Sequence, residues 1–112
     1  SHQYKANALS AIAEAYSQLK QPEKAAPLLE KALVAANSIS DSSNKADALS
    51  TIAEAEANLQ NWGQALKVVQ QCPSDDCKVD SLARVLTIYA EQEHPELNLR
   101  QAKIQRDRDD SK

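Results

Sequence analysis

The sequence contains two cysteines, Cys72 and Cys77, in the segment QCPSDDC. A C-x4-C pair without further cysteines or a nearby histidine supplies too few ligands for a structural zinc site. Two alternatives stay open: a disulfide that closes a short loop in an oxidising compartment, or two unpaired thiols. An unpaired cysteine can also simply pack as a compact apolar side chain.

His94 is the other side chain with catalytic potential, because it follows Glu91 by three residues and could share a helical face with it. Pro95 comes directly after His94, which favours a turn at the surface instead. The sequence shows no Gly-rich phosphate loop, no nucleophile motif and no cluster with metal-ligand spacing. We therefore expect a protein that is not an enzyme and binds no metal or cofactor. Residues 1–4, with His2, are interpreted as a leader.

The composition predicts an all-α protein. The chain has 112 residues, which fits one domain, and it contains a single Gly, no Phe and no Met. Ala, Leu, Gln, Glu and Lys dominate, and these residues lose little conformational freedom on entering a helix.

Charge and hydropathy argue against nucleic-acid binding and against membrane insertion. Residues 1–99 carry eight Lys and Arg against thirteen Asp and Glu, whereas residues 100–112 carry five against three. An acidic body argues against nucleic acid as the main ligand. No apolar run approaches the roughly 20 residues that cross a bilayer, so no membrane insertion is expected. These features predict a cytoplasmic protein, with a processed secreted or periplasmic form as the alternative.

The chain contains an internal repeat. Residues 5–15 read KANALSAIAEA and residues 45–55 read KADALSTIAEA, so that nine of the eleven positions are identical. Apolar residues recur at the three- and four-residue spacing of amphipathic helices. Helices are expected over about residues 4–19, 22–39, 45–59, 62–72, 76–91 and 95–105. Asn61 is expected to cap the fourth helix. The side chains expected to point inward include Ile12, Leu66, Leu82, Leu86 and Tyr89.

These repeats resemble the tetratricopeptide repeat, a helix-turn-helix unit of about 34 residues with small residues where its two helices cross. In the first unit the signature positions hold Leu9, Ile12, Ala13, Tyr16, Ala25, Leu29 and Ala32. In the second unit they hold Leu49, Ile52, Ala53, Ala65, Val69 and Cys72. The resemblance is closest to bacterial multi-repeat proteins or a fragment of one. It departs from the pattern at Glu56, where an aromatic is usual, and at Lys20 and Gln60, where many members have Gly.

The resemblance implies an α-solenoid of antiparallel helix pairs with about six helices. The repeat domain would span residues 5–106, in units of about 5–44, 45–77 and 78–106. The last unit matches only in its first helix and is interpreted as degenerate or capping. Residues 107–112 are expected to form a disordered charged tail.

The resemblance also implies a binding surface, since the first helices of such units line a concave face that holds a partner peptide. The corresponding polar residues here are Asn7, Ser10, Glu14, Ser17, Gln18, Asp47, Ser50, Thr51, Glu54, Asn58, Asp80, Arg84, Thr87 and Glu91. Carboxylates outnumber the single guanidinium in this set, which favours a basic or polar partner. The alternative is that these residues are only the solvated face of amphipathic helices.

The resemblance predicts a non-catalytic protein-interaction module whose partner is another protein or peptide. Binding of chaperone C-terminal tails is not expected, because only Arg84 fits the basic and amide positions that such binding needs. A second interpretation is a self-assembling scaffold subunit whose copies associate through the ends of the repeat stack.

Overall fold

A computed structural model describes residues 1–96 and Arg108. Residues 1–96 form five α-helices and no strands, so the predicted all-α class is confirmed. The helices are α1 (His2–Gln18), α2 (Pro22–Asn37), α3 (Ser42–Asn58), α4 (Trp62–Gln70) and α5 (Asp75–Glu93). The helix expected over 95–105 and the tail expected over 107–112 lie almost entirely outside the described residues.

Side-chain caps set where three of the helices begin, among them α5, where the Ser74 hydroxyl accepts from the Cys77 N–H at 3.2 Å. The Ser1 hydroxyl accepts a hydrogen bond from the Tyr4 N–H at 3.3 Å, so α1 starts within the stretch interpreted as a leader. Asp41 accepts from the Asn44 N–H at 2.9 Å, so α3 starts three residues before the expected position. Caps of this kind satisfy backbone donors that have no partner within the helix.

Asn61 is the N-cap residue of α4, as predicted, but its side chain makes no capping hydrogen bond to that helix. Its amide donates instead to the Glu56 carboxylate at 3.1 Å. That carboxylate is buried on α3 and needs a donor more than the exposed helix end does.

The sequence repeat returns as a structural repeat in the turns that follow α1 and α3. Lys20 and Gln60 both adopt left-handed backbone conformations, with φ of 60° and 64°. The next residue's N–H donates back to a helix carbonyl in each turn, from Gln21 to Tyr16 and from Asn61 to Glu56, both at 2.9 Å. Hydrogen bonds of this span are typical of the Schellman ending of a helix.

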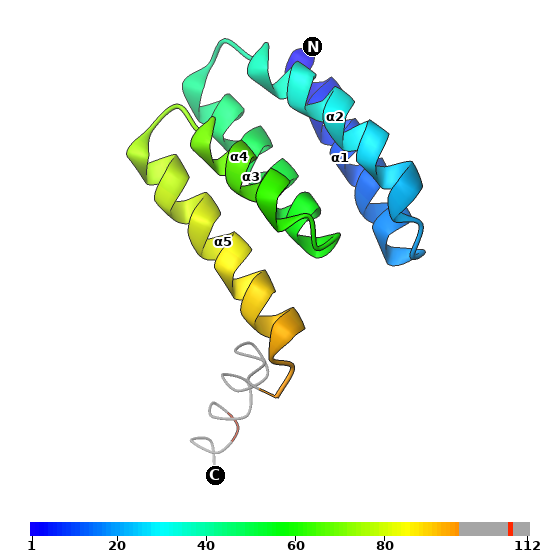
Figure 1. Cartoon of the computed structure of the whole chain (residues 1–112). Coiled ribbons are helices and arrows are strands. Elements are labelled where there is room, and N and C mark those ends of the chain that lie inside the picture. Colours follow the sequence, from blue (N-terminus) through cyan, green and yellow to red (C-terminus); the bar gives the residue numbers. More distant parts are fainter. Residues whose placement is uncertain (97–107, 109–112) are drawn as a thin grey trace.

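The helices pack as neighbours, with α3 at the centre (Figure 1). α1 packs against α2, α3 packs against α4, and α3 also contacts α1, α2 and α5. α5 lies against α3 and α4. Small side chains at the contacts let the helix axes approach closely. The fully buried ones are Ala25, Ala32, Ala36, Ala53, Ala57 and Ala65.

The prediction that several apolar residues point inward was wrong, because these side chains are exposed. Leu82, Leu86 and Tyr89 on α5 keep 38%, 55% and 46% of their surface accessible, because α3 and α4, the helices that α5 packs against, leave them partly uncovered. Ile12 on α1 and Leu66 on α4 are likewise exposed, at 47% and 43%. By contrast, Val85 and Ile88 on α5 are buried.

Candidate functional site

A polar hollow of about 370 Å³ lies between α1 and α3. It is lined by Glu14, Ser17 and Gln18 from α1 and by Ala55 and Asn58 from α3. We call it the Glu14 hollow. Four of these five residues belong to the set that the resemblance assigned to a partner, and the fifth, Ala55, is a buried neighbour that forms part of its wall.

A second hollow, of about 210 Å³, lies between α3 and α5. It is lined by Glu54 from α3 and by Asp80, Ala83, Arg84 and Thr87 from α5, and we call it the Arg84 hollow. Arg84 donates to Asp80 at 3.1 Å and to Glu54 at 3.4 Å. The Arg84 guanidinium therefore contacts one carboxylate on its own helix, α5, and one on the neighbouring helix, α3.

The Glu14 carboxylate is affected by burial and by the negative charge of Glu54. Burial raises the pKa of Glu14, and the charge of Glu54 raises it further. Within residues 1–96 and Arg108, Glu14 takes part in no ion pair, whereas Glu54 is paired with Arg84. The lining residues of each hollow carry a formal net charge of −1, but only the Arg84 hollow contains a cation.

Two of the residues predicted to contact a partner are buried, which corrects that prediction. Ser10 and Ser50 keep only 2% and 5% of their surface accessible, so neither is an exposed contact for a partner. Ser50 borders a hollow between the first turns of α3 and α5, but its hydroxyl is bonded to α5. Ser50 forms a 2.7 Å hydrogen bond with Ser81 on α5, a buried polar contact that the repeat pattern did not indicate.

The other predicted residues lie on the surface or are half-buried. Thr51 and Thr87 turn their hydroxyls back to carbonyls one helical turn earlier, at 3.0 Å and 2.8 Å. Exposed members are Asn7, Gln18, Asp47, Asn58, Asp80 and Arg84; half-buried members are Glu14, Ser17, Thr51, Glu54, Thr87 and Glu91.

Cys72 and Cys77 form a disulfide, which decides between the two alternatives left open above. It joins the residue after the α4 C-cap to the first turn of α5, with a Cα–Cα distance of 5.6 Å. The Ser81 hydroxyl lies 3.5 Å from the Cys72 sulfur. A hollow of about 340 Å³ beside this disulfide is bordered by the first turns of α3 and α5.

An apolar hollow of about 220 Å³ lies between α4 and α5. It is lined by Trp62, Leu66, Val85, Leu86 and Tyr89, and we call it the Trp62 hollow. The Trp62 and Tyr89 rings meet edge to face with their centroids 5.2 Å apart. Leu66, Leu86 and Tyr89 were expected to point inward, so the sequence did not predict this surface.

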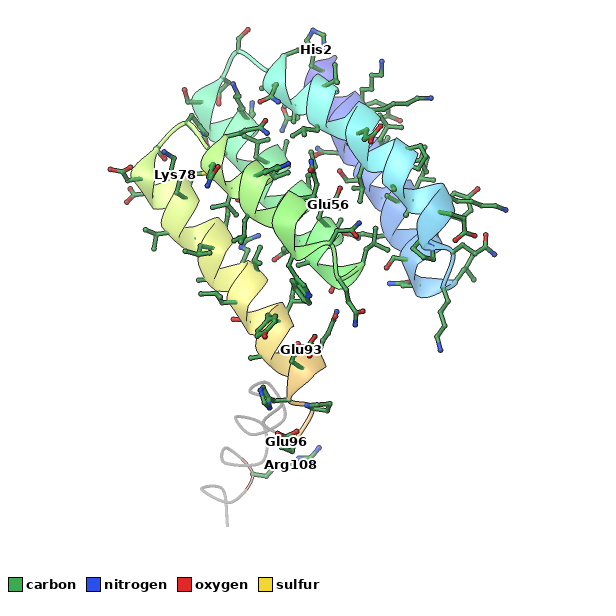
Figure 2. All side chains as sticks on the ribbon, viewed as in Figure 1. His2, Glu56, Lys78, Glu93, Glu96 and Arg108 are labelled. Carbon is green, nitrogen blue, oxygen red and sulfur yellow. A yellow bond between two sulfur atoms is a disulfide. The ribbon has the colours of Figure 1, made fainter. Side chains whose placement is uncertain are left out.

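Glu56 is a buried carboxylate, with 5% of its surface accessible. Figure 2 shows it on the part of α3 that lies beside the α1–α2 pair. Burial raises the pKa of Glu56, the hydrogen bond from Asn61 opposes that rise, and the charge of Glu30 on α2 adds to it. Its side chain lines none of the hollows described above, so its effect is expected on stability and not on binding.

The sequence left open that His94 and Glu91 share one face of a helix, but His94 lies beyond the last helical residue of α5. It follows the end of α5, and its Nδ1 lies 3.2 Å from the Glu96 carboxylate on an exposed turn. The hydrogen bond to its own backbone lowers the pKa of Glu96, and the His94 contact lowers it further.

Comparisons with known proteins leave the family unassigned. No protein-family model matches the chain, and neither curated proteins nor solved structures gave a match. Among residues 1–96 and Arg108, no helix is long and apolar enough to cross a membrane. Within the same residues, no three His, Cys, Asp or Glu side chains are grouped as metal ligands would be.

Proposed function

We propose that this chain is a non-catalytic protein-interaction module of the tetratricopeptide type, an α-solenoid that binds a partner peptide or protein on its first-helix face. The observation that carries the proposal is the pair of adjacent polar hollows. Each is lined almost entirely by residues that were selected from sequence positions alone.

Further support comes from the repeated local structure. The same left-handed turn follows α1 and α3, and each of these helices packs against the helix after it. A repeated helix pair places equivalent side chains of α1, α3 and α5 along one face. That arrangement suits an extended ligand lying across several helices.

Site-specific photocrosslinking tests the proposal. We would place a benzoylphenylalanine at Ser17 in the Glu14 hollow and, as the control, at exposed Lys31 on α2. The expected result is a discrete crosslinked partner from the source cell at Ser17 only. The adduct should decrease when Glu14→Lys and Glu54→Lys are introduced together, while the melting temperature stays the same. Equal crosslinking at both positions would contradict groove binding.

The alternative function is a self-assembling scaffold subunit, and the Trp62 hollow favours it. Leu66, Leu86 and Tyr89 are large apolar side chains that stay accessible on α4 and α5, at the end of the described stack. Exposed apolar clusters of this kind often mark association surfaces.

Light scattering at several protein concentrations separates the two functions. Assembly predicts a mass that rises with concentration and returns to the monomer value in Leu86→Glu. A chain that is monomeric throughout the concentration range would rule out the assembly function and leave the peptide-binding one.

The disulfide bears on the compartment. Disulfides persist in oxidising compartments and are rare in the reducing cytosol, so the Cys72–Cys77 bond favours a secreted or periplasmic location over the cytoplasmic one expected from the sequence. Alkylation of thiols in intact cells, followed by mass measurement, tests this. Two alkylated cysteines would support the cytoplasmic location.

A further inference from the structure

We infer that the Glu14 hollow is the subsite for a cationic side chain, Lys or Arg, of the partner peptide. This inference rests on the proposed function, since it names the chemistry that one part of the binding face recognises. It concerns a hollow with a single carboxylate and three neutral hydrogen-bonding side chains.

The first step is the volume and lining of the hollow. About 370 Å³ is ample for one long side chain together with some of its backbone. Ser17, Gln18 and Asn58 surround the carboxylate with hydroxyl and amide groups, which can donate to or accept from a peptide. The walls therefore supply neutral hydrogen bonds and one charge.

The second step is the distribution of charge along the face. Arg84 already contacts Asp80 and Glu54, so the Arg84 hollow contains its own cation. Among the described residues Glu14 has no such partner, although the charge of Glu54 acts on it. A ligand cation at Glu14 would therefore meet a carboxylate with no resident cation beside it, and would also offset the repulsion between Glu14 and Glu54.

The third step is burial. Glu14 is half-buried, and burial is the largest cause of the rise in its pKa. A partly desolvated carboxylate attracts a cation more strongly than a fully exposed one, because less water screens the pair. A neutral or acidic peptide side chain would leave that carboxylate without compensation.

The test is an NMR titration of the full 15N-labelled chain with four pentapeptides. The probes are Ac-Ala-Ser-Arg-Ser-Ala-amide and the versions with Lys, norleucine or Glu at the centre. The side-chain amides of Gln18 and Asn58 report on the hollow directly. The variant is Glu14→Gln, which keeps the shape and removes the charge, and the control is Glu23→Gln, an exposed carboxylate on α2.

We expect the Arg and Lys peptides to shift both amides and to bind about fivefold more tightly than the norleucine peptide. Glu14→Gln should abolish that preference and Glu23→Gln should keep it. Equal shifts from the norleucine peptide, an unchanged preference in Glu14→Gln, or no shift from any peptide would each overturn the inference. A partner that still crosslinks at Ser17 would then show that the proposed function stands without this subsite.

Discussion

At the scale of single residues, the buried polar side chains of α3 carry the largest energetic consequences. Glu56 is buried at a position where the tetratricopeptide repeat usually has an aromatic residue, and within residues 1–96 its one side-chain hydrogen bond comes from Asn61. Burying a carboxylate without a cation disfavours its charged form. Glu56 is therefore expected to limit the stability of the chain at neutral pH.

Glu56→Gln should raise the stability at neutral pH by roughly 1 kcal/mol, because the amide keeps an acceptor for Asn61 and removes the buried charge. The pKa of Glu56 is raised in the folded state, so the folded chain holds the proton more tightly than the unfolded one. Stability of the parent should then fall as pH rises above the unfolded value of 4.5 through the higher folded pKa. Urea denaturation between pH 4 and 8 measures this.

Glu30→Gln is the companion variant, since the charge of Glu30 contributes to the raised pKa of Glu56. It should give a smaller gain and reduce the pH dependence without removing it. Parallel pH profiles for the parent and Glu56→Gln would contradict the assignment of this pH dependence to Glu56.

Ser50 and Ser81 form the second buried polar contact, between α3 and α5. Ser81→Ala should lower the free energy of unfolding by about 1 to 3 kcal/mol, because it leaves the Ser50 hydroxyl buried without this partner. The double variant Ser50→Ala with Ser81→Ala should recover part of the loss. A double-mutant cycle in urea measures the coupling, and strictly additive losses would show that the contact contributes nothing.

At the scale of helices and turns, the left-handed residues that end α1 and α3 are the notable feature. Lys20 and Gln60 adopt positive φ, a conformation that Gly reaches without steric cost and other residues do not. The resemblance marked these two positions because many family members have Gly there. The structure gives the physical reason for that preference.

Replacing both Lys20 and Gln60 with Gly should stabilise the chain by about 0.5 to 1 kcal/mol at each turn, because relief of the left-handed strain exceeds the extra entropy of Gly in the unfolded state. Calorimetry measures the rise in melting temperature. Gln21→Gly is the matched control, since Gln21 has φ of −121° and offers no strain to relieve. A gain in the control equal to that at Lys20 would refute the explanation.

Helix content and turn positions could be predicted because they depend on local signals. Periodicity, Pro22 and the repeat located α1 to α5, and a local cap such as Asp41 shifts a boundary by only a few residues. The exposure of Leu82 and Leu86 could not be predicted, because it depends on which helix lies opposite.

The candidate site was predictable to a similar degree. Four of the five residues of the Glu14 hollow were expected from the resemblance to the tetratricopeptide repeat, whose equivalent positions share a face. Burial of Ser10 and Ser50 did not follow, because a serine suits a tight helix contact as well as a wet surface. The Trp62 hollow was missed for the converse reason, since apolar residues at helical spacing were assigned to the core.

At the scale of the whole molecule, stability is distributed between neighbouring helices. α1 and α2 pack on each other and on α3, whereas α5 rests on α3 and α4 (Figure 1). The Cys72–Cys77 disulfide ties the start of α5 to the end of α4. A perturbation at that bond should therefore act on α5 first and reach α1 only through α3.

Reduction of the disulfide should lower the free energy of unfolding by about 2 kcal/mol, the loop-closure entropy expected for so short a loop. Hydrogen exchange should show the loss of protection concentrated in α4 and α5, with α1 and α2 less affected, because those two helices keep all their packing partners. Urea denaturation and hydrogen exchange of the full chain, with and without reductant, measure both effects.

The double variant Cys72→Ala with Cys77→Ala is the control and should not respond to reductant. An equal loss of protection in all five helices would show that the chain unfolds as one unit and that the disulfide stabilises it globally.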